Sequence, residues 1–253
     1  MAINVNTVYQ TVLLILNKEQ RGYMTPDEFN SVGTQVQLEV FEKYFEDLNQ
    51  QIRVPQTDFN YSDRVENIDE KIAIFKTFGN AEYKPLATTT DKPFALPTID
   101  SYGIAVDFYR LGEVTHNNEV LVQRLQRNDF YTSEKSKLTK ATTTFPTYLY
   151  ENNLLYVRPT IIISNIQVDY IKKPLNPVWG FTVGTLGQYQ YDNSAYNPAA
   201  VPATGSRNFE LHESEQTEII LRILQYAGII IRDPQIIQAA AQQVQMDEMN
   251  KKS

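Results

Sequence analysis

The segment 23–49, YMTPDEFNSVGTQVQLEVFEKYFEDLN, constrains the fold more than any other part of the sequence. Thr25 is suited to cap a helix, and Pro26 is suited to its first position. Glu28 follows Thr25 by three residues and completes a capping box, so a helix is predicted to start here. One face repeats apolar residues at helical spacing: Phe29, Val32, Val36, Val40, Tyr44 and Leu48, widened by Phe41 and Phe45. This helix is a packing surface without a pattern for chemistry.

Four other segments have helical patterns. Helices are predicted over residues 7–18 and 61–78. Near the C-terminus, residues 214–228 combine acids in the first turn with an apolar face, and Gly228 fits the position after the last turn. A last helix is predicted over Asp233–Asn250. Its apolar stripe is narrow and consists of Ile236, Ile237, Ala240, Ala241 and Val244.

Residues 102–172 have the pattern of β-strands. The β-prone runs TYLYE and LLYVR flank Asn152 and Asn153, which tolerate the positive φ of a tight hairpin turn. Asn117 and Asn118 separate two earlier runs in the same way, and NIQVDYIKKP adds another strand. Residues 128–142 fit either a short polar helix or a loop. Helices at both ends with strands between them predict an α+β fold with a central antiparallel β region.

The predicted organisation has four parts. These are an N-terminal helical region over 1–80, a β-rich region over 81–180, an irregular loop over 181–208 and a C-terminal helical region over 209–253. We expect the helices of both ends to form one helical domain. The loop is rich in Tyr, Asn, Gly and Pro and is long for a structureless connection inside a domain. It is therefore mobile, ordered by a neighbouring subunit, or folded back on its own sheet.

Motifs for catalysis or cofactor binding do not occur in the sequence. It has no Cys and two His: His116 falls in a predicted turn, and His212 precedes a helix that it can cap. Neither a phosphate-binding glycine loop nor a Gly-x-Ser-x-Gly elbow occurs. Clustered carboxylates lie on predicted helix surfaces: Glu46 and Asp47, Glu66, Asp69 and Glu70, and Asp247 and Glu248. We expect no enzyme activity, no metal and no cofactor. A hydrolase whose carboxylates are hidden by the fold is the alternative.

The charge argues against a nucleic-acid binder. The net charge is −7, and residues 1–76 carry 12 acids against 7 bases. Residues 77–212 carry 12 of each, and residues 213–253 carry 6 acids and 4 bases. Because a protein that grips duplex DNA needs a basic surface, we expect no duplex binding at physiological salt.

Aromatic side chains are abundant, with 16 Tyr, 12 Phe and 1 Trp. Tyr and Trp favour interfaces because they combine a large contact area with a polar group. The candidate contact residues are Trp179, Tyr189, Tyr191 and Tyr196 in and beside the irregular loop, and Ile236, Ile237, Ala240 and Val244 of the last helix. Trp179, which follows Lys172 and Lys173, also fits a stacking site for single-stranded nucleic acid.

Long phrases of the sequence resemble one protein family. They are INVNTVYQTVLLILNKEQRGYMTPDEFN near the N-terminus, IQVDYIKKPLNPVWGF in the middle, and NFELHESEQTEIILRILQYAGIIIRDPQIIQAA near the C-terminus. In this order they are similar to the head-to-tail connector proteins of tailed bacteriophages, specifically the ring proteins of crAss-like phages. The resemblance spans most of the chain, although residues 100–130 match less closely, and it contains no chemical motif.

The resemblance implies a structural virion protein. Such proteins form a ring, usually dodecameric, that connects the portal vertex to the tail and lines the DNA ejection channel. The implied partners are further copies of the chain, the portal protein and other tail or ring proteins, with DNA passing through without specific binding and no membrane contact. The expected location is the virion after synthesis in the host bacterial cytoplasm, because no secretory signal or membrane-spanning run is evident. A cytosolic scaffold protein is a further alternative.

Overall fold

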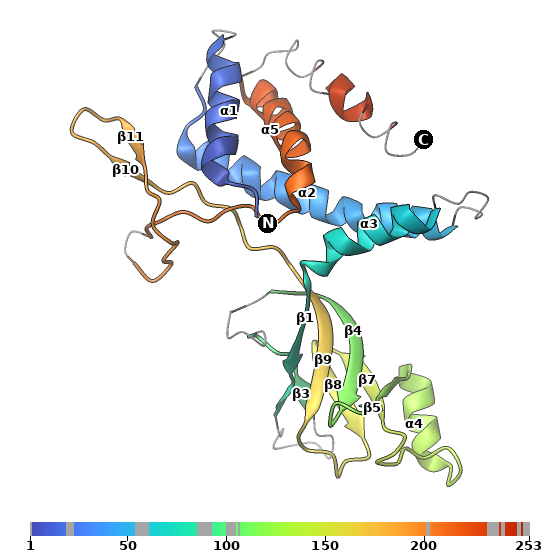
Figure 1. Ribbon diagram of the computed structural model, residues 1–253. Helices are drawn as coiled ribbons and strands as arrows, with labels where there is room; N and C mark the ends of the chain where they lie inside the picture. The colour runs from blue at the N-terminus through green and yellow to red at the C-terminus, as the bar shows by residue number, and fades with distance from the viewer. Residues whose placement is uncertain are drawn as a thin grey trace. The chain divides into compact units, whose positions relative to one another are not determined.

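The computed structural model describes residues 2–18, 23–53, 61–84, 93–99, 105, 107–200, 203–231, 238, 241–246 and 249. The chain divides into two compact units. Unit 1 contains Met1–Ile74 and Pro174–Ser253, and unit 2 contains Phe75–Lys173. The predicted α+β class is confirmed, because helices lie at both ends of the chain and antiparallel sheets lie between them (Figure 1).

The unit boundaries differ from those predicted at residues 80 and 180. They lie at residues 74 and 173, so the segment 174–208 belongs with the helices rather than with the sheets. The predicted third helix also ends early, because residues 76–80 form a strand. In that strand Gly79 faces Pro97 so closely that a Cβ would lie 2.8 Å from the proline Cβ, and glycine allows this approach. Strand pairing therefore replaces the last turn of the predicted helix.

Unit 1 is built from α1 (Val5–Lys18), α2 (Pro26–Arg53), α3 (Tyr61–Ala73) and α5 (Gln216–Ile231), with the short 3-10 helix η1 (Glu213–Glu215) before α5. The capping box of α2 is confirmed. The backbone N–H of Thr25 donates to Glu28 Oε2 at 2.8 Å, and the N–H of Glu28 donates to Thr25 Oγ1 at 3.4 Å. Gly228 does not end α5 as predicted, because the helix continues to Ile231.

The core of unit 1 lies where α2 and α1 pack against α5. The predicted apolar face of α2 is confirmed, with Phe29, Val36, Val40 and Phe41 buried. The core also includes Val5, Val8, Val12, Leu16, Ile219, Ile223 and Ala227 from the other two helices. Ile3 pairs with Phe209 in an antiparallel bridge, so the chain entering α1 is fixed beside the chain that leads to α5.

Unit 2 contains two sheets. Their strands are β1 (Lys76–Asn80), β2 (Glu82–Tyr83), β3 (Pro93–Ala95), β4 (Phe108–His116), β5 (Val120–Leu121), β6 (Gln123–Arg124), β7 (Thr147–Glu151), β8 (Leu154–Arg158) and β9 (Ile166–Lys172). One sheet has the order β1-β9-β4-β5 and the other β2-β3-β8-β7-β6. The chain passes between the sheets at Ala81 and again at Val122, each of which separates two short strands. One buried cluster includes residues from both sheets, such as Leu155, Val168 and Tyr170.

The tight turns of unit 2 follow the sequence prediction. Asn152 and Asn153 have φ values of 53° and 59° and join β7 to β8, and Asn117 and Asn118 likewise have positive φ after β4. The polar segment after β6 forms α4 (Arg127–Lys135), whose Phe130 is buried. The paired asparagines were therefore sufficient to predict where the two turns lie.

Unit 1 also carries a hairpin made of β10 (Phe181–Val183) and β11 (Tyr189–Tyr191). It extends away from the helices of its unit (Figure 1). The segment that was predicted to be irregular therefore contains regular antiparallel pairing.

Candidate functional site

Trp179 lies at the base of the β10–β11 hairpin and is buried, with 5% of its surface exposed. Its ring lies 4.4 Å from the ring of Tyr9, and it stacks on Phe181 and Tyr191 at 6.1 and 5.6 Å between centroids. The indole Nε1 donates to Asn6 Oδ1 at 3.0 Å. Trp179 is thus packed against other side chains of unit 1, which leaves little of its ring surface for a partner, and its role as a contact residue stays a prediction.

Asp192 organises the chain that follows the hairpin. Its Oδ1 accepts from the backbone N–H of Ser194 at 3.0 Å and from the Ser194 hydroxyl at 2.7 Å, and its Oδ2 accepts from the N–H of Gly205 at 3.0 Å. The Ser206 hydroxyl donates to the backbone oxygen of Asp192 and receives the N–H of Gly180. The hydrogen bonds from Ser194 and Gly205 hold the pKa of the Asp192 carboxyl below its ordinary value. The loop is therefore ordered by its own chain.

The other three aromatic candidates of this segment lie in different settings. Tyr191 is half-buried against Trp179, and Tyr196 lies beneath Arg207, whose guanidinium carbon is 4.3 Å from the ring centroid. Tyr189 is exposed on β11 and packs edge-on against Phe181. The structure thus brings Trp179, Tyr189 and Tyr191 together at the hairpin, and it leaves Tyr189 as the most accessible of these.

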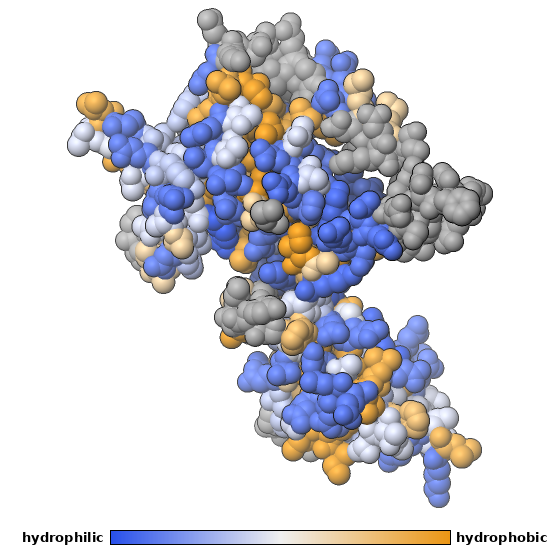
Figure 2. All heavy atoms as spheres, viewed as in Figure 1, coloured by the Kyte–Doolittle hydropathy of each residue, from blue (hydrophilic) through white to orange (hydrophobic). Residues whose placement is uncertain are grey.

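Apolar side chains are exposed at the tip of the hairpin. Leu186 is 90% exposed, and Val183, three residues earlier, is also exposed. Figure 2 shows this apolar surface at the end of the hairpin. Sequence reasoning did not select Leu186, although an isolated Leu between two Gly residues in a polar segment was a usable signal.

The candidates of the last helix are only partly described. Ile236, Ile237 and Ala240 lie outside the described residues. Val244 is helical and half-buried, and residues 242, 243 and 245 around it are exposed. This pattern agrees with a narrow apolar stripe at Val244.

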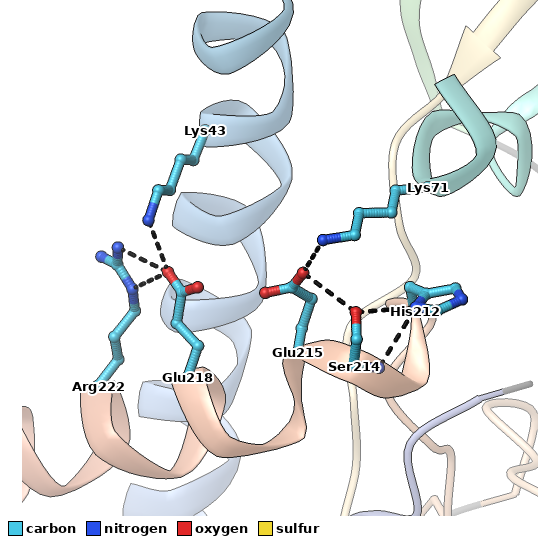
Figure 3. A network of polar contacts seen from close by, with 7 residues as sticks. All are labelled: Lys43, Lys71, His212, Ser214, Glu215, Glu218 and Arg222. Carbon is cyan, nitrogen blue, oxygen red and sulfur yellow. Dashed lines mark hydrogen bonds and ion pairs between the residues drawn. The ribbon is translucent and has the colours of Figure 1, made fainter. Parts of the chain in front are cut away.

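The buried carboxylates of unit 1 form ion pairs with cations (Figure 3). Glu218 of α5 lies 3.0 Å from Lys43 of α2 and 3.0 Å from Arg222 of its own helix. Glu215 of η1 pairs with Lys71 of α3 and has 2% of its side chain exposed. These pairs connect α2, α3 and α5 through charge-assisted hydrogen bonds.

His212 caps η1, as its position suggested. Its Nδ1 accepts from the backbone N–H of Ser214 at 3.3 Å, and it lies 2.9 Å from the Ser214 hydroxyl. The other histidine, His116, is the last residue of β4. His116 belongs to unit 2 and His212 to unit 1, and each has its own local setting.

Two tyrosines near the ion pairs have raised pKa values. Burial, with Glu215 and Glu218 nearby, raises the pKa of Tyr44 above its ordinary value. A hydrogen bond to Glu39 raises the pKa of Tyr226. The buried Glu215 and Glu218 pair with lysines of α3 and α2, and these contacts link the helices.

An open pocket of about 460 Å³ lies beside the start of α4, and its lining includes Arg127 and Glu151, which form an ion pair at 3.6 Å. Within the described ranges, no group of three or more His, Asp or Glu residues is placed to hold a metal ion. Among the described helices, none is both long and apolar enough to cross a bilayer.

Comparison of the sequence with protein-family models and with curated proteins finds no match.

Proposed function

We propose that this protein is a ring subunit that connects the portal vertex of a tailed bacteriophage to its tail. The similarity of three long sequence phrases to the ring proteins of crAss-like phages supports this function. In the ring, the subunit contacts neighbouring copies and the portal or tail proteins, and the ring surrounds the channel through which DNA leaves the head.

The structural observation that carries the proposal is the braced hairpin. An isolated two-stranded hairpin is marginally stable in water. This one has a base fixed by the stacked rings around Trp179 and by the hydrogen bonds of Asp192, and it presents Leu186 to solvent. A rigid element with an exposed apolar tip is suited to insert into a neighbouring protein, because little conformational entropy is lost on binding.

The ion pairs of Figure 3 are better explained by helix packing than by hydrolysis. The two carboxylates of a glycosidase flank the scissile bond and must be able to reach it. Glu215 and Glu218 are instead buried, and their oxygens pair with Lys71 and Lys43 of neighbouring helices. These two residues are therefore poor candidates for the acid of a glycosidase.

Incorporation into virions tests the proposal. We expect the wild-type protein to be found in purified particles and Leu186→Ser to be incorporated roughly tenfold less, because a buried apolar anchor carries much of an interface's energy. The matched control is Ile99→Ser, which removes an exposed apolar side chain of unit 2. Deletion of residues 234–253 is likewise expected to leave a folded protein that is not incorporated.

Two results would count against these statements. Absence of the wild-type protein from particles would overturn the proposed function. Normal incorporation of Leu186→Ser, with a wild-type circular dichroism spectrum, would remove the hairpin tip from the interface.

A further inference from the structure

One end of unit 2 presents apolar side chains to solvent. Leu138, Phe145 and Ile161 are 97%, 76% and 73% exposed, and Ile163 is also exposed. We call the turns that carry Phe145, Ile161 and Ile163 the apolar end, and Leu138 lies in the segment that leads into the first of these turns. Thr147 pairs with Arg158, so the turns that precede β7 and follow β8 lie at the same end of their sheet. Figure 2 shows apolar surface on unit 2 at this end, where β8 leads into β9.

The turns of the apolar end are held in place by hydrogen bonds. The backbone N–H of Phe145 donates to Thr142 Oγ1 at 3.1 Å, and the N–H of Thr142 donates back to the Phe145 oxygen at 3.2 Å. In the other turn Ile162 is buried, and its N–H donates to the Pro159 oxygen at 3.1 Å. Ile161 and Ile163 are therefore held outward on either side of an anchored residue.

Several basic residues lie close to the apolar end in the sequence. Lys135, Lys137 and Lys140 are exposed around Leu138 in the sequence. Residues 123–147 as a whole carry five bases and two acids, in a protein whose net charge is −7. Exposed apolar side chains with basic residues nearby in the sequence fit a partner surface that is both acidic and apolar.

Unit 1 carries exposed acids on two helices that pack together, with an exposed apolar residue just after one of them. Glu66 and Glu70 are exposed on α3 at a spacing of four residues, and four residues later Ile74 is exposed. Glu42 and Glu46 have the same spacing and are exposed on α2, which packs against α3. We call Glu42, Glu46, Glu66, Glu70 and Ile74 the acidic face.

We propose that the apolar end of one copy docks on the acidic face of the next copy. The two surfaces differ, so the contact is head-to-tail, and repeated head-to-tail contacts with a suitable rotation close into a ring. This inference rests on the proposed function and specifies which surfaces join neighbouring subunits. The complementary charges on the same chain favour a second copy over an anionic lipid surface as the partner.

Charge reversal in the purified full-length protein tests the docking. Variant A carries Lys137→Glu and Lys140→Glu, and variant B carries Glu66→Lys and Glu70→Lys. We expect each alone to self-associate roughly 100-fold more weakly than wild type by analytical ultracentrifugation at low salt, because like charges then meet. A mixture of A and B restores assembly, since A then contacts only B and B only A. Combining all four substitutions in one chain restores it as well.

Two controls separate this effect from misfolding and from general charge. Lys84→Glu changes an exposed lysine of unit 2 that is distant in the sequence from the turns of the apolar end. This variant is expected to leave assembly unchanged. The double substitution Phe145→Ser with Ile161→Ser tests the apolar contribution. It is expected to weaken assembly at low and at high salt alike, because salt screens interactions between charges and not apolar contacts.

Several outcomes would overturn the docking. They are a wild-type protein that stays monomeric across the micromolar range, variants A and B that assemble like wild type, or a mixture that fails to recover assembly. Sedimentation with phosphatidylserine vesicles through Lys137 and Lys140, without self-association, would assign the apolar end to lipid. If virions contain the protein and also accept variants A and B, the proposed function stands and the docking is rejected. If the protein self-associates through these surfaces but is absent from virions, the docking stands and the proposed function is rejected.

Discussion

At the scale of single residues, the ion pair of Lys71 with Glu215 joins parts of the chain that are far apart in sequence. Glu215 is almost fully buried, and Lys71 comes from the last turn of α3. The sequence identified Glu215 only as one of the acids in the first turn of a helix. Its burial depends on the packing of α3, which local patterns do not contain. By contrast, the cap made by His212 was predictable because both partners lie within two residues.

We predict that Lys71→Met lowers the free energy of unfolding of unit 1 by about 3 kcal/mol, because it removes the lysine that pairs with the buried Glu215. The measurement is urea unfolding followed by circular dichroism at a helical wavelength, since the long helices belong to unit 1. The double substitution Lys71→Met with Glu215→Leu is expected to recover most of the loss.

The matched control for this pair is Lys84→Met. Lys84 faces Glu82 at 3.9 Å with both side chains exposed, so its loss is expected to cost less than about 1 kcal/mol. Equal effects of the two lysine substitutions would contradict the assigned role of the buried pair.

At the scale of elements, the helix α2 and the β7–β8 hairpin were predictable because their signals are local. A capping box, a repeating apolar face and an Asn-Asn turn specify them within a few residues. The β10–β11 hairpin was not predicted, because its pairing depends on Trp179 and Asp192 at its base rather than on alternation within its strands. The two bulges in β4 were also not predictable, since they depend on pairing with β9.

We predict that Gly205→Ala opens the loop that Asp192 organises. Gly205 has φ of +83°, and an added Cβ would lie 2.3 Å from the backbone oxygen of Ala195. Limited proteolysis is therefore expected to cut residues 192–206 much faster in this variant. Asp192→Ala is expected to have the same effect by removing the acceptor of three hydrogen bonds.

Gly187→Ala is the matched control for this loop. Gly187 has φ of +80°, but nothing lies within 4 Å of the added Cβ, so only backbone strain of about 1 kcal/mol is expected. If Gly205→Ala is cut no faster than Gly187→Ala, crowding at Gly205 does not control the loop.

The loop also has an expected pH dependence. The pKa of Asp192 is lower in the folded chain than in the unfolded chain, so the carboxylate stabilises the loop at neutral pH. This contribution is lost as the pH falls through the lowered pKa of the folded form. Hydrogen exchange of the Ser194 and Gly205 amides is expected to lose protection in acid before the helices unfold.

At the scale of the whole molecule, the chain combines a helical unit with a β unit and carries three proposed contact surfaces. The hairpin tip and the acidic face belong to unit 1, and the apolar end belongs to unit 2. The sequence predicted the α+β class and suggested the ring function through its resemblance to a family. It misplaced the unit boundaries because helical spacing continues from Ile68 and Ile72 to Phe75, past the end of α3.

In the proposed assembly, copies of this protein join head-to-tail into a ring. Electron cryo-microscopy of the wild-type protein, assembled at low salt and in native particles, is the decisive test. We expect a closed ring at the junction of head and tail, in which the turns carrying Phe145 and Ile161 of each copy lie on α2 and α3 of the next. A monomer, or a twofold dimer in which the same surface of both copies meets itself, would contradict it.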